Sequence, residues 1–251
     1  MALLERDAHG RPAYRAINSC IALLPMFAGR EVVTDEGLAC GGGMHPVQRA
    51  MVDNYGSQCG YCTPGFVMSL FAEQYRPHRA GPCDPLAMAG NLCRCTGYRP
   101  IRHAALALGP APPRPFADRL MRPPPRVEAA ALEGFERPAT VNDCVRRLAA
   151  RPGARLVAGA TDLGVESNIR GDRWPLLIGV EAIDELHVFE ESADAILIGA
   201  ALPLADIGRL WRRAPAVIHE WLALFASPPI RNPPSLGGSL ATASPIGDAA
   251  P

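Results

Sequence analysis

Four cysteines stand in two close pairs whose spacing suits metal binding. Cys59 and Cys62 are separated by two residues, and Cys93 and Cys95 by one. A [2Fe–2S] cluster has two tetrahedral irons that each need two protein thiolates, so two such pairs in facing loops meet its demand. A structural zinc site also takes four thiolates in a tetrahedral array, and the spacing alone leaves both metals open. A disulfide framework is disfavoured because the chain carries no secretion signal.

Four short helices are expected to position these cysteines. Proline in the first helical turn, often after a capping side chain, is a helix start signal. The expected starts are His45-Pro46, Thr63-Pro64, Asp84-Pro85 and Pro100, and the last helix runs to Leu108. The two cysteine pairs then fall in the loops between helices one and two and between helices three and four. Because a helix begins directly after Cys62, the positive end of its dipole favours thiolates at that position.

The chain changes character after Pro110. Seven prolines between Pro110 and Pro125 are too many for a helix or a central strand, and they predict a stiff, extended linker. Beyond the linker, the pattern of caps, buried strands and glycine turns predicts an α+β unit. Its expected elements are a helix from Thr140 to Ala150, strands at 155–158 and 195–198, and helical segments from Leu204 to Phe225.

Composition limits the partners and the compartment. Basic and acidic residues both number 25, so no net field favours nucleic acid or an anionic membrane. No apolar run approaches the roughly 20 residues of a membrane-spanning helix, and the charged start is unlike a signal peptide. Eight cysteines without an export signal predict metal or redox chemistry in a reducing, cytoplasmic compartment.

Several other reactive side chains have simpler interpretations. Cys144 lies within a predicted helix and is expected to be a small buried apolar residue, whereas Cys40 and Cys83 are expected in loops. His45 is interpreted as a helix cap or surface residue, because no second histidine or carboxylate is spaced to join it as a metal ligand. Three arginines near the second cysteine pair are interpreted as solvated charge, with a docking face or tuning of a cluster's reduction potential as the alternatives. They are Arg94, Arg99 and Arg102.

Two strings of residues resemble the helical [2Fe–2S] domain of the xanthine dehydrogenase family. They are Gly56-Ser-Gln-Cys-Gly-Tyr-Cys-Thr-Pro-Gly-Phe-Val-Met-Ser-Leu70 and Gly90-Asn-Leu-Cys-Arg-Cys-Thr-Gly-Tyr-Arg-Pro-Ile101. The similarity extends back through Tyr14-Arg-Ala-Ile-Asn-Ser-Cys20 and His45-Pro-Val-Gln48, and forward to the end of the chain. The order of iron–sulfur unit and then flavin unit resembles the smaller subunit of the bacterial two-subunit enzymes. A motif in its expected structural context favours iron over zinc.

The resemblance implies a multidomain α and α+β fold, in which a four-helix [2Fe–2S]-binding domain precedes an incomplete α+β FAD-binding domain. The expected divisions are the end of a plant-type ferredoxin-like domain at 1–22, the four-helix domain at 23–109, the linker at 110–127 and the flavin domain at 128–251. It also implies a chain cut short at both ends, which assembles one of the family's two clusters and binds FAD poorly.

The resemblance assigns ligands to the metal and pterin sites. Cys59, Cys62, Cys93 and Cys95 match the ligands of the helical-domain cluster. Cys20 matches the last ligand of the plant-type cluster, whose three earlier ligands would lie upstream of Met1 in the family. Two residues match positions that contact the pterin cofactor of a molybdenum-binding partner subunit, and these are Gln58 and Cys95.

The flavin contacts implied by the resemblance lie mainly in two glycine turns, whose backbone N–H groups would wrap the FAD pyrophosphate. The first turn consists of Leu156, Val157, Ala158, Gly159, Ala160, Thr161, Asp162 and Leu163. The second consists of Ser235, Leu236, Gly237, Gly238 and Ser239, and Phe225 and Asp248 match further contacts. Glycine would permit positive φ and close approach of the ligand. Ser239 departs from the asparagine frequent in relatives, and neither turn fits the G-x-G-x-x-G fingerprint of a Rossmann fold.

The function implied by the resemblance is electron relay. A partner molybdenum subunit would oxidise hypoxanthine or xanthine to urate, and electrons would pass through [2Fe–2S] clusters to FAD and then to NAD, so no catalytic residue is expected in this chain. An aldehyde or heterocycle hydroxylase of the same superfamily is an alternative, since the substrate is chosen in the molybdenum subunit. A zinc-stabilised interaction module is the alternative from another class, and it would be colourless.

Overall fold

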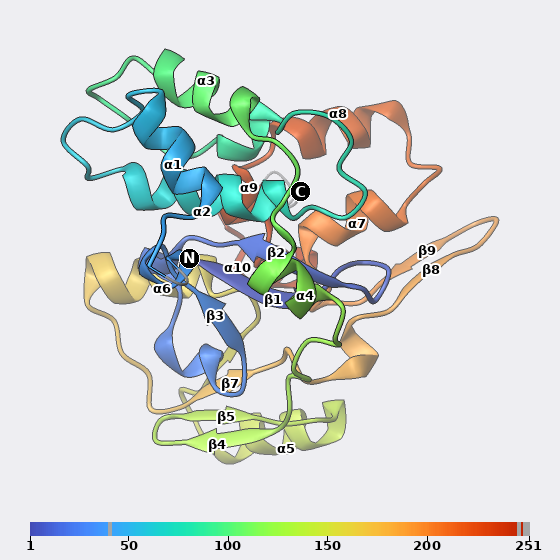
Figure 1. The fold of residues 1–251 in the computed structure, drawn as a ribbon. Coiled ribbons are helices and arrows are strands. Elements are labelled where there is room, and N and C mark those ends of the chain that lie inside the picture. The colour runs from blue at the N-terminus through green and yellow to red at the C-terminus, as the bar shows by residue number, and fades with distance from the viewer. Residues whose placement is uncertain (40–41, 245–246, 248–251) are drawn as a thin grey trace. The chain divides into compact units, whose positions relative to one another are not determined.

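The computed structural model describes residues 1–39, 42–244 and 247 of the chain (Figure 1). Contacts between residues divide the chain into two compact units. The helical unit comprises Met1–Ile17, Glu31–Pro125 and Ser227–Pro229. The α+β unit comprises Asn18–Arg30, Arg126–Ala226 and Ile230–Pro251. The fold class predicted from the sequence, multidomain α and α+β, is confirmed.

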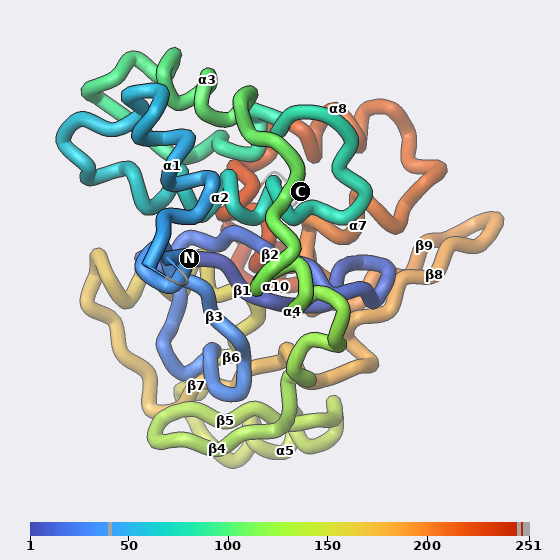
Figure 2. The backbone as a smooth tube through the Cα atoms, viewed as in Figure 1, coloured from blue at the N-terminus to red at the C-terminus, as the bar shows by residue number. Residues whose placement is uncertain are grey.

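The helical unit combines a small antiparallel sheet with the four predicted helical segments. The strands are β1 (Ala2–Arg6), β2 (Pro12–Ala16) and β3 (Glu31–Val33), in the order β2-β1-β3. The helices are α1 (Pro46–Asp53), α2 (Thr63–Gln74) and α3 (Arg99–Ala107). The third predicted helix is a single 3-10 segment, Pro85–Met88, and Gly90 with its φ of +91° follows two residues later. The tube in Figure 2 follows this path from the blue hairpin into the blue-green helices.

The helix α2 lies at the centre of one hydrophobic core that also includes the sheet. Leu4, Tyr14 and Val33 from the strands are buried together with Phe66 and Phe71 of α2. A sheet of three short strands buries its apolar face by packing against the helices, so it shares their core. The predicted division at residue 22 therefore differs from the structure, in which residues 1–17 pack with the helices and residues 18–30 with the α+β unit.

His45 caps α1, as one of the two interpretations of the sequence had it. Its Nδ1 accepts the N–H of Val47 at 3.3 Å, and its backbone N–H donates to the side chain of Gln48 at 3.0 Å, which together form a capping box. Its Nε2 lies 3.1 Å from the hydroxyl of Tyr75, and the residue is only 6% exposed. Burial lowers the pKa of His45 from 6.5 to about 4, because the imidazolium would lose its hydration.

The stability of the helical unit should therefore fall as the pH drops from about 6.5 toward 4. His45 is neutral in the folded chain throughout this window but gains a proton when the chain unfolds. The contribution of His45 to the free energy of unfolding is fully present above pH 6.5. It amounts to about 3 kcal/mol at most, because that energy corresponds to a fall in pKa from 6.5 to about 4. Calorimetric melting between pH 4 and 8 measures this slope. The His45→Asn variant keeps a capping side chain without the titration, and an identical slope in that variant would contradict the assignment.

The predicted linker is not simply extended. Residues Pro113–Ala117 and Asp118–Leu120 form a helical turn, and the ring of Phe116 is buried in the core of the helical unit. The Tyr14 hydroxyl donates to the carbonyl oxygen of Phe116 at 3.2 Å. Prolines cluster at both ends of this segment, so its centre is free to form a turn around one buried aromatic side chain.

The α+β unit is built on a four-stranded sheet in the order β4-β5-β7-β6. The strands are β4 (Ala130–Leu132), β5 (Phe135–Arg137), β6 (Arg155–Val157) and β7 (Leu177–Gly179), and only the β4–β5 pair is antiparallel. A separate hairpin joins β8 (Phe189–Glu191) and β9 (Ile196–Ile198). The helices are α5 (Val141–Ala150), α6 (Thr161–Val165), α7 (Leu204–Leu210), α8 (Ala216–Leu224), α9 (Pro228–Arg231) and α10 (Leu236–Thr242). The first two residues of α9 belong to the helical unit. The predicted cap at Thr140 is confirmed, since its side chain accepts the N–H of Asp143 at 3.2 Å.

A buried group of charges lies inside the α+β unit. The Glu181 carboxylate lies 3.4 Å from Nε of Arg137 and 3.5 Å from a guanidinium nitrogen of Arg30. Arg137 is 2% exposed and also donates to the carbonyl oxygens of Met26, at 2.8 Å, and Ala28, at 3.0 Å. These contacts fix the segment 26–30 to the strand β5.

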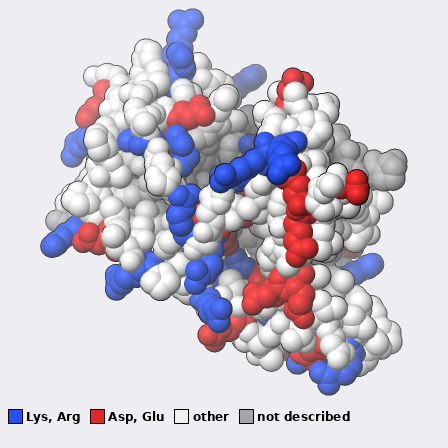
Figure 3. All heavy atoms as spheres, turned by 90° about the vertical axis from the view of Figure 1, so that its right-hand side faces the viewer, with Lys and Arg blue, Asp and Glu red and all other residues white. Residues whose placement is uncertain are grey.

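The described helices and the charged side chains of one face bear on the expectations from composition. Among the described residues, no helix is long and apolar enough to cross a membrane. The face drawn in Figure 3 carries basic and acidic side chains among uncharged ones, and every blue side chain there is an arginine because the sequence contains no lysine.

Candidate functional site

The two cysteine pairs lie in the predicted loops of the helical unit. Cys59 and Cys62 follow α1, and Cys62 is the residue directly before α2. Cys93 and Cys95 lie between the 3-10 segment Pro85–Met88 and α3. The sequence therefore places both loops correctly relative to the helices.

The structure brings the four thiols together as two pairs, each of which joins one loop to the other. The thiol of Cys59 interacts with that of Cys95, and the thiol of Cys62 with that of Cys93. In the described part of the chain, no three His, Cys, Asp or Glu side chains gather in the arrangement that one metal ion needs. Two thiol pairs match the donor set that a [2Fe–2S] cluster needs, with two thiolates for each iron.

The two pairs differ in exposure and in pKa. Cys59 and Cys95 are exposed, whereas Cys93 is buried and Cys62 is partly buried. Burial raises the pKa of Cys62 to about 11. Hydrogen bonds from Thr96 lower the pKa of Cys93 to about 7, because its hydroxyl lies 3.1 Å and its N–H 3.5 Å from the sulfur. The pKa of Cys59 is lowered, first by the backbone N–H of Tyr61.

Three residues around the second loop escaped the sequence interpretation. The first is Thr96, which contacts the sulfur of Cys93. The second is Tyr98, whose hydroxyl accepts the backbone N–H of Cys93 at 3.1 Å. Tyr98 lies just before α3 and has a φ of +67°. The Asn91 side chain donates to the Ser69 hydroxyl of α2 and to the carbonyl oxygen of Met88, both at 2.9 Å. Hydrogen bonds around cysteine ligands tune the reduction potential of an iron–sulfur cluster, so Thr96 and Tyr98 are candidates for a place in the site. The sequence offered a signal for Thr96 alone, because a threonine directly follows the Cys-x-Cys run.

The exposed edge of the site carries the residues predicted to face a partner's pterin. Gln58 and Cys95 are both exposed, as is Cys59. The pterin contacts themselves remain a prediction.

Cys20 lies in the α+β unit, whereas the four paired cysteines lie in the helical unit. It is exposed, and its thiol donates to the Asn18 side chain at 3.0 Å. Its carbonyl oxygen accepts a hydrogen bond from Asn168, and a Cβ on Gly164 of α6 would lie 1.9 Å from the carbonyl oxygen of Ile21. The segment that bears Cys20 thus rests on α6. Cys40 lies outside the described residues, and Cys83 and Cys144 are buried.

The two glycine turns meet in the α+β unit. The first turn leads from β6 into α6, and the second forms the start of α10, whose cap Ser235 accepts the N–H of Gly238 at 3.1 Å. The Asp162 carboxylate accepts hydrogen bonds from the hydroxyls of Ser244, at 2.9 Å, and Thr242, at 3.3 Å. The predicted flavin-contacting segments are therefore adjacent, although they are far apart in the sequence.

The expected role of the glycines in these turns is corrected in one respect. The positive φ of the first turn falls on Ala160, at +59°, and none of Gly159, Gly237 and Gly238 has a positive φ. Instead, a Cβ on Gly159 would lie 2.2 Å from the carbonyl oxygen of Pro233, and one on Gly237 would lie 2.6 Å from Ala200. Close approach of the chain to itself already requires glycine at these two positions.

The remaining predicted flavin contacts lie near the second turn. Phe225 follows α8, and its ring centre lies 4.8 Å from that of Trp221. Phe225 and Leu236 pack against the same apolar cluster. Asp248 lies outside the described residues. The flavin contacts remain predictions.

Family models and known proteins match both parts of the chain. Residues 34–106 match the [2Fe-2S] binding domain, and residues 130–251 match the FAD binding domain in molybdopterin dehydrogenase. Xanthine dehydrogenase 2 of Arabidopsis thaliana is 30% identical over 314 residues, which cover 94% of this chain and 23% of that protein. Xanthine dehydrogenase of Drosophila subobscura is 30% identical over 309 residues, covering 99% of this chain and 23% of the relative.

The chain thus spans about a quarter of the length of these relatives. Among solved structures, a carbon monoxide dehydrogenase from Hydrogenophaga pseudoflava is 26% identical with a TM-score of 0.43, over 49% of this chain and 44% of that one. The two domain matches and the xanthine dehydrogenases that align with almost the whole chain agree on one assignment. The chain belongs to the xanthine dehydrogenase family of molybdenum-dependent oxidoreductases, as a portion that contains its [2Fe–2S]-binding and FAD-binding domains.

Proposed function

We propose that this chain carries electrons from a molybdenum–pterin centre on a partner subunit to FAD, and from there to NAD. The observation that supports the proposal most directly is the pairing of four thiols across two loops, with one pair exposed and the other largely buried. An exposed pair faces an electron donor, while the buried pair anchors the loops to the helices.

The residues of the helical unit would hold a [2Fe–2S] cluster, which supplies one-electron transfer when it is bound. Cys59 and Cys95 would ligate one iron, and Cys62 and Cys93 the other. Thr96 donates to the sulfur of Cys93 and so stabilises its thiolate form. Gln58 and Cys95 would meet the pterin of the partner subunit at the exposed edge, and Cys20 would contribute one ligand to a second, plant-type cluster.

The α+β unit would hold FAD between its two glycine turns. Backbone N–H groups at the starts of α6 and α10 would bind the pyrophosphate, apart from that of Gly238, which donates to Ser235. Asp162 connects the two segments. Phe225 and Asp248 would add contacts to the flavin. The proposed reaction of the complete assembly is oxidation of hypoxanthine or xanthine to urate, with the substrate selected by the partner subunit.

Purified chain, reconstituted anaerobically with ferrous iron, sulfide and FAD, should contain about two irons, because four paired thiols satisfy one cluster. Reduction with dithionite should give an electron paramagnetic resonance signal and bleach the visible bands. Chelation should remove the cluster bands and lower the melting temperature of the helical unit. A colourless chain that binds one zinc ion with equal stability would overturn the proposal.

A further inference from the structure

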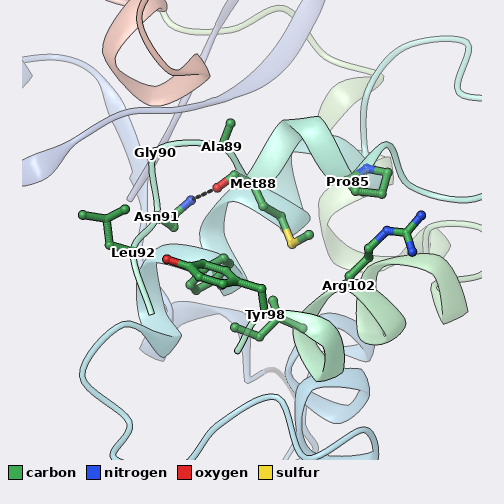
Figure 4. Close-up of a pocket in the computed structure, with 10 residues that line it drawn as sticks. Pro85, Met88, Ala89, Gly90, Asn91, Leu92, Tyr98 and Arg102 are labelled. Carbon is green, nitrogen blue, oxygen red and sulfur yellow. Dashed lines mark hydrogen bonds between the residues drawn. The ribbon is translucent and has the colours of Figure 1, made fainter. Parts of the chain in front are cut away.

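An apolar pocket opens beside the second cysteine loop of the helical unit. Its volume is about 330 Å³, and Figure 4 shows Met88 and Tyr98 facing one another across it. Its lining includes the buried side chains of Phe66, Met88 and Ile101, and its only charged lining residue is Arg102 of α3. A cavity of this size accommodates one large apolar side chain or a small ligand.

The apolar lining continues onto the exposed surface. Leu92, which lines the pocket, is 81% exposed, and Leu86 of the adjoining 3-10 segment is 73% exposed. Tyr98 lines the pocket, is 44% exposed, and accepts the N–H of the cluster residue Cys93 at its hydroxyl. Contiguous exposed apolar side chains beside a pocket are typical of an interaction surface. The pocket wall is thus continuous with the loop that holds the second cysteine pair.

Arginine supplies most of the charge near the pocket, although the whole chain is balanced. The segments 54–72 and 85–117, which include both cysteine loops, contain no aspartate or glutamate, and the exposed Asp84 stands directly before the second segment. Within the described residues, Arg94, Arg99 and Arg102 have no ion pair and no side-chain hydrogen bond. Guanidinium groups pair with carboxylates in a two-point geometry, so this face is complementary to an acidic surface.

We propose that the pocket is an anchor point for the molybdenum-binding partner subunit, which inserts one large apolar side chain between Met88 and Tyr98 and places a carboxylate on Arg102. This proposal rests on the proposed function, because it assumes that electrons arrive from that partner. It adds the site and the chemistry of docking. The arginine-rich surface favours an acidic partner segment, and continuity with the Cys93 loop brings that partner to the cluster site.

The test measures the affinity of the iron- and FAD-loaded chain for the purified molybdenum-binding subunit that is proposed as its partner. Arg102→Glu replaces the guanidinium group at the pocket with a carboxylate. Ala89→Trp places a large side chain at the exposed rim of the pocket and fills it. Each variant should weaken binding about tenfold or more, since anchor residues dominate an interface. Arg102→Glu should also reduce the salt dependence of binding. The matched control is Arg49→Glu, a reversal at an exposed arginine of α1, which should change affinity less than about twofold.

Wild-type affinity in both pocket variants would overturn the docking site and leave the relay intact. A chain that holds iron and flavin but does not bind the subunit would also overturn it. Concentration-dependent self-association that both variants abolish would show that a second copy of this chain occupies the pocket, which contradicts the proposal. A wild-type chain without iron would instead remove the proposed function, and the docking proposal would fall with it.

Discussion

Replacing Cys93 with Ser should reduce the iron content of the reconstituted chain from about two atoms to near zero. Cys93 is the buried member of its thiol pair, and its sulfur accepts the hydroxyl and the N–H of Thr96. The lower pKa of about 7 makes it the thiol of this group most readily converted to thiolate. A serine hydroxyl stays protonated near neutral pH and would leave one iron with a single thiolate.

The same change should lower the melting temperature of the helical unit to that of the chelated wild-type chain, because metal binding energy is also folding energy. Iron analysis and calorimetry measure the two effects. The matched control is Cys83→Ser, which alters another buried cysteine of the same unit outside the two thiol pairs and should retain the iron. Full iron content in the Cys93 variant, or equal iron loss in both, would show that the paired thiols are not the ligands.

Replacing Arg137 with Met should destabilise the α+β unit by about 3–5 kcal/mol, the cost of leaving one member of a buried ion pair without its partner. The Glu181 carboxylate would remain buried with Arg30 as its only close cation. The carbonyl oxygens of Met26 and Ala28 would also lose their donor. The segment 26–30 should then detach from the sheet before the rest of the unit unfolds.

Tryptophan fluorescence during urea unfolding reports this unit selectively, since all three tryptophans belong to it. The double variant Arg137→Met with Glu181→Gln should recover part of the loss, because it removes the uncompensated charge. The control is Arg146→Met, which breaks an ion pair of 2.6 Å with Asp143 on an exposed side chain and should cost less than about 1 kcal/mol. Equal losses in the buried and exposed variants would contradict the role of burial.

Local signals in the sequence determined where the helices begin and where the cysteines lie relative to them. The capping side chains of His45, Asp84 and Thr140 and the prolines after the first two act within three or four residues, so each of these predicted starts agrees with the structure. The spacing of the cysteine pairs and the surrounding motif were also sufficient to identify the family, because they lie in short continuous strings.

Only the tertiary structure decided how distant segments combine. The pairing of Cys59 with Cys95, the burial of Phe116 and the contacts of Arg137 with Glu181 and Arg30 join residues far apart in the chain. The sequence showed that glycine would permit positive φ in the flavin turns, but in the first turn packing places the positive φ on Ala160 and brings Pro233 close to Gly159. Such contacts depend on the path of the whole backbone, and the free energy of burying a group is set by neighbours that no short window of sequence contains.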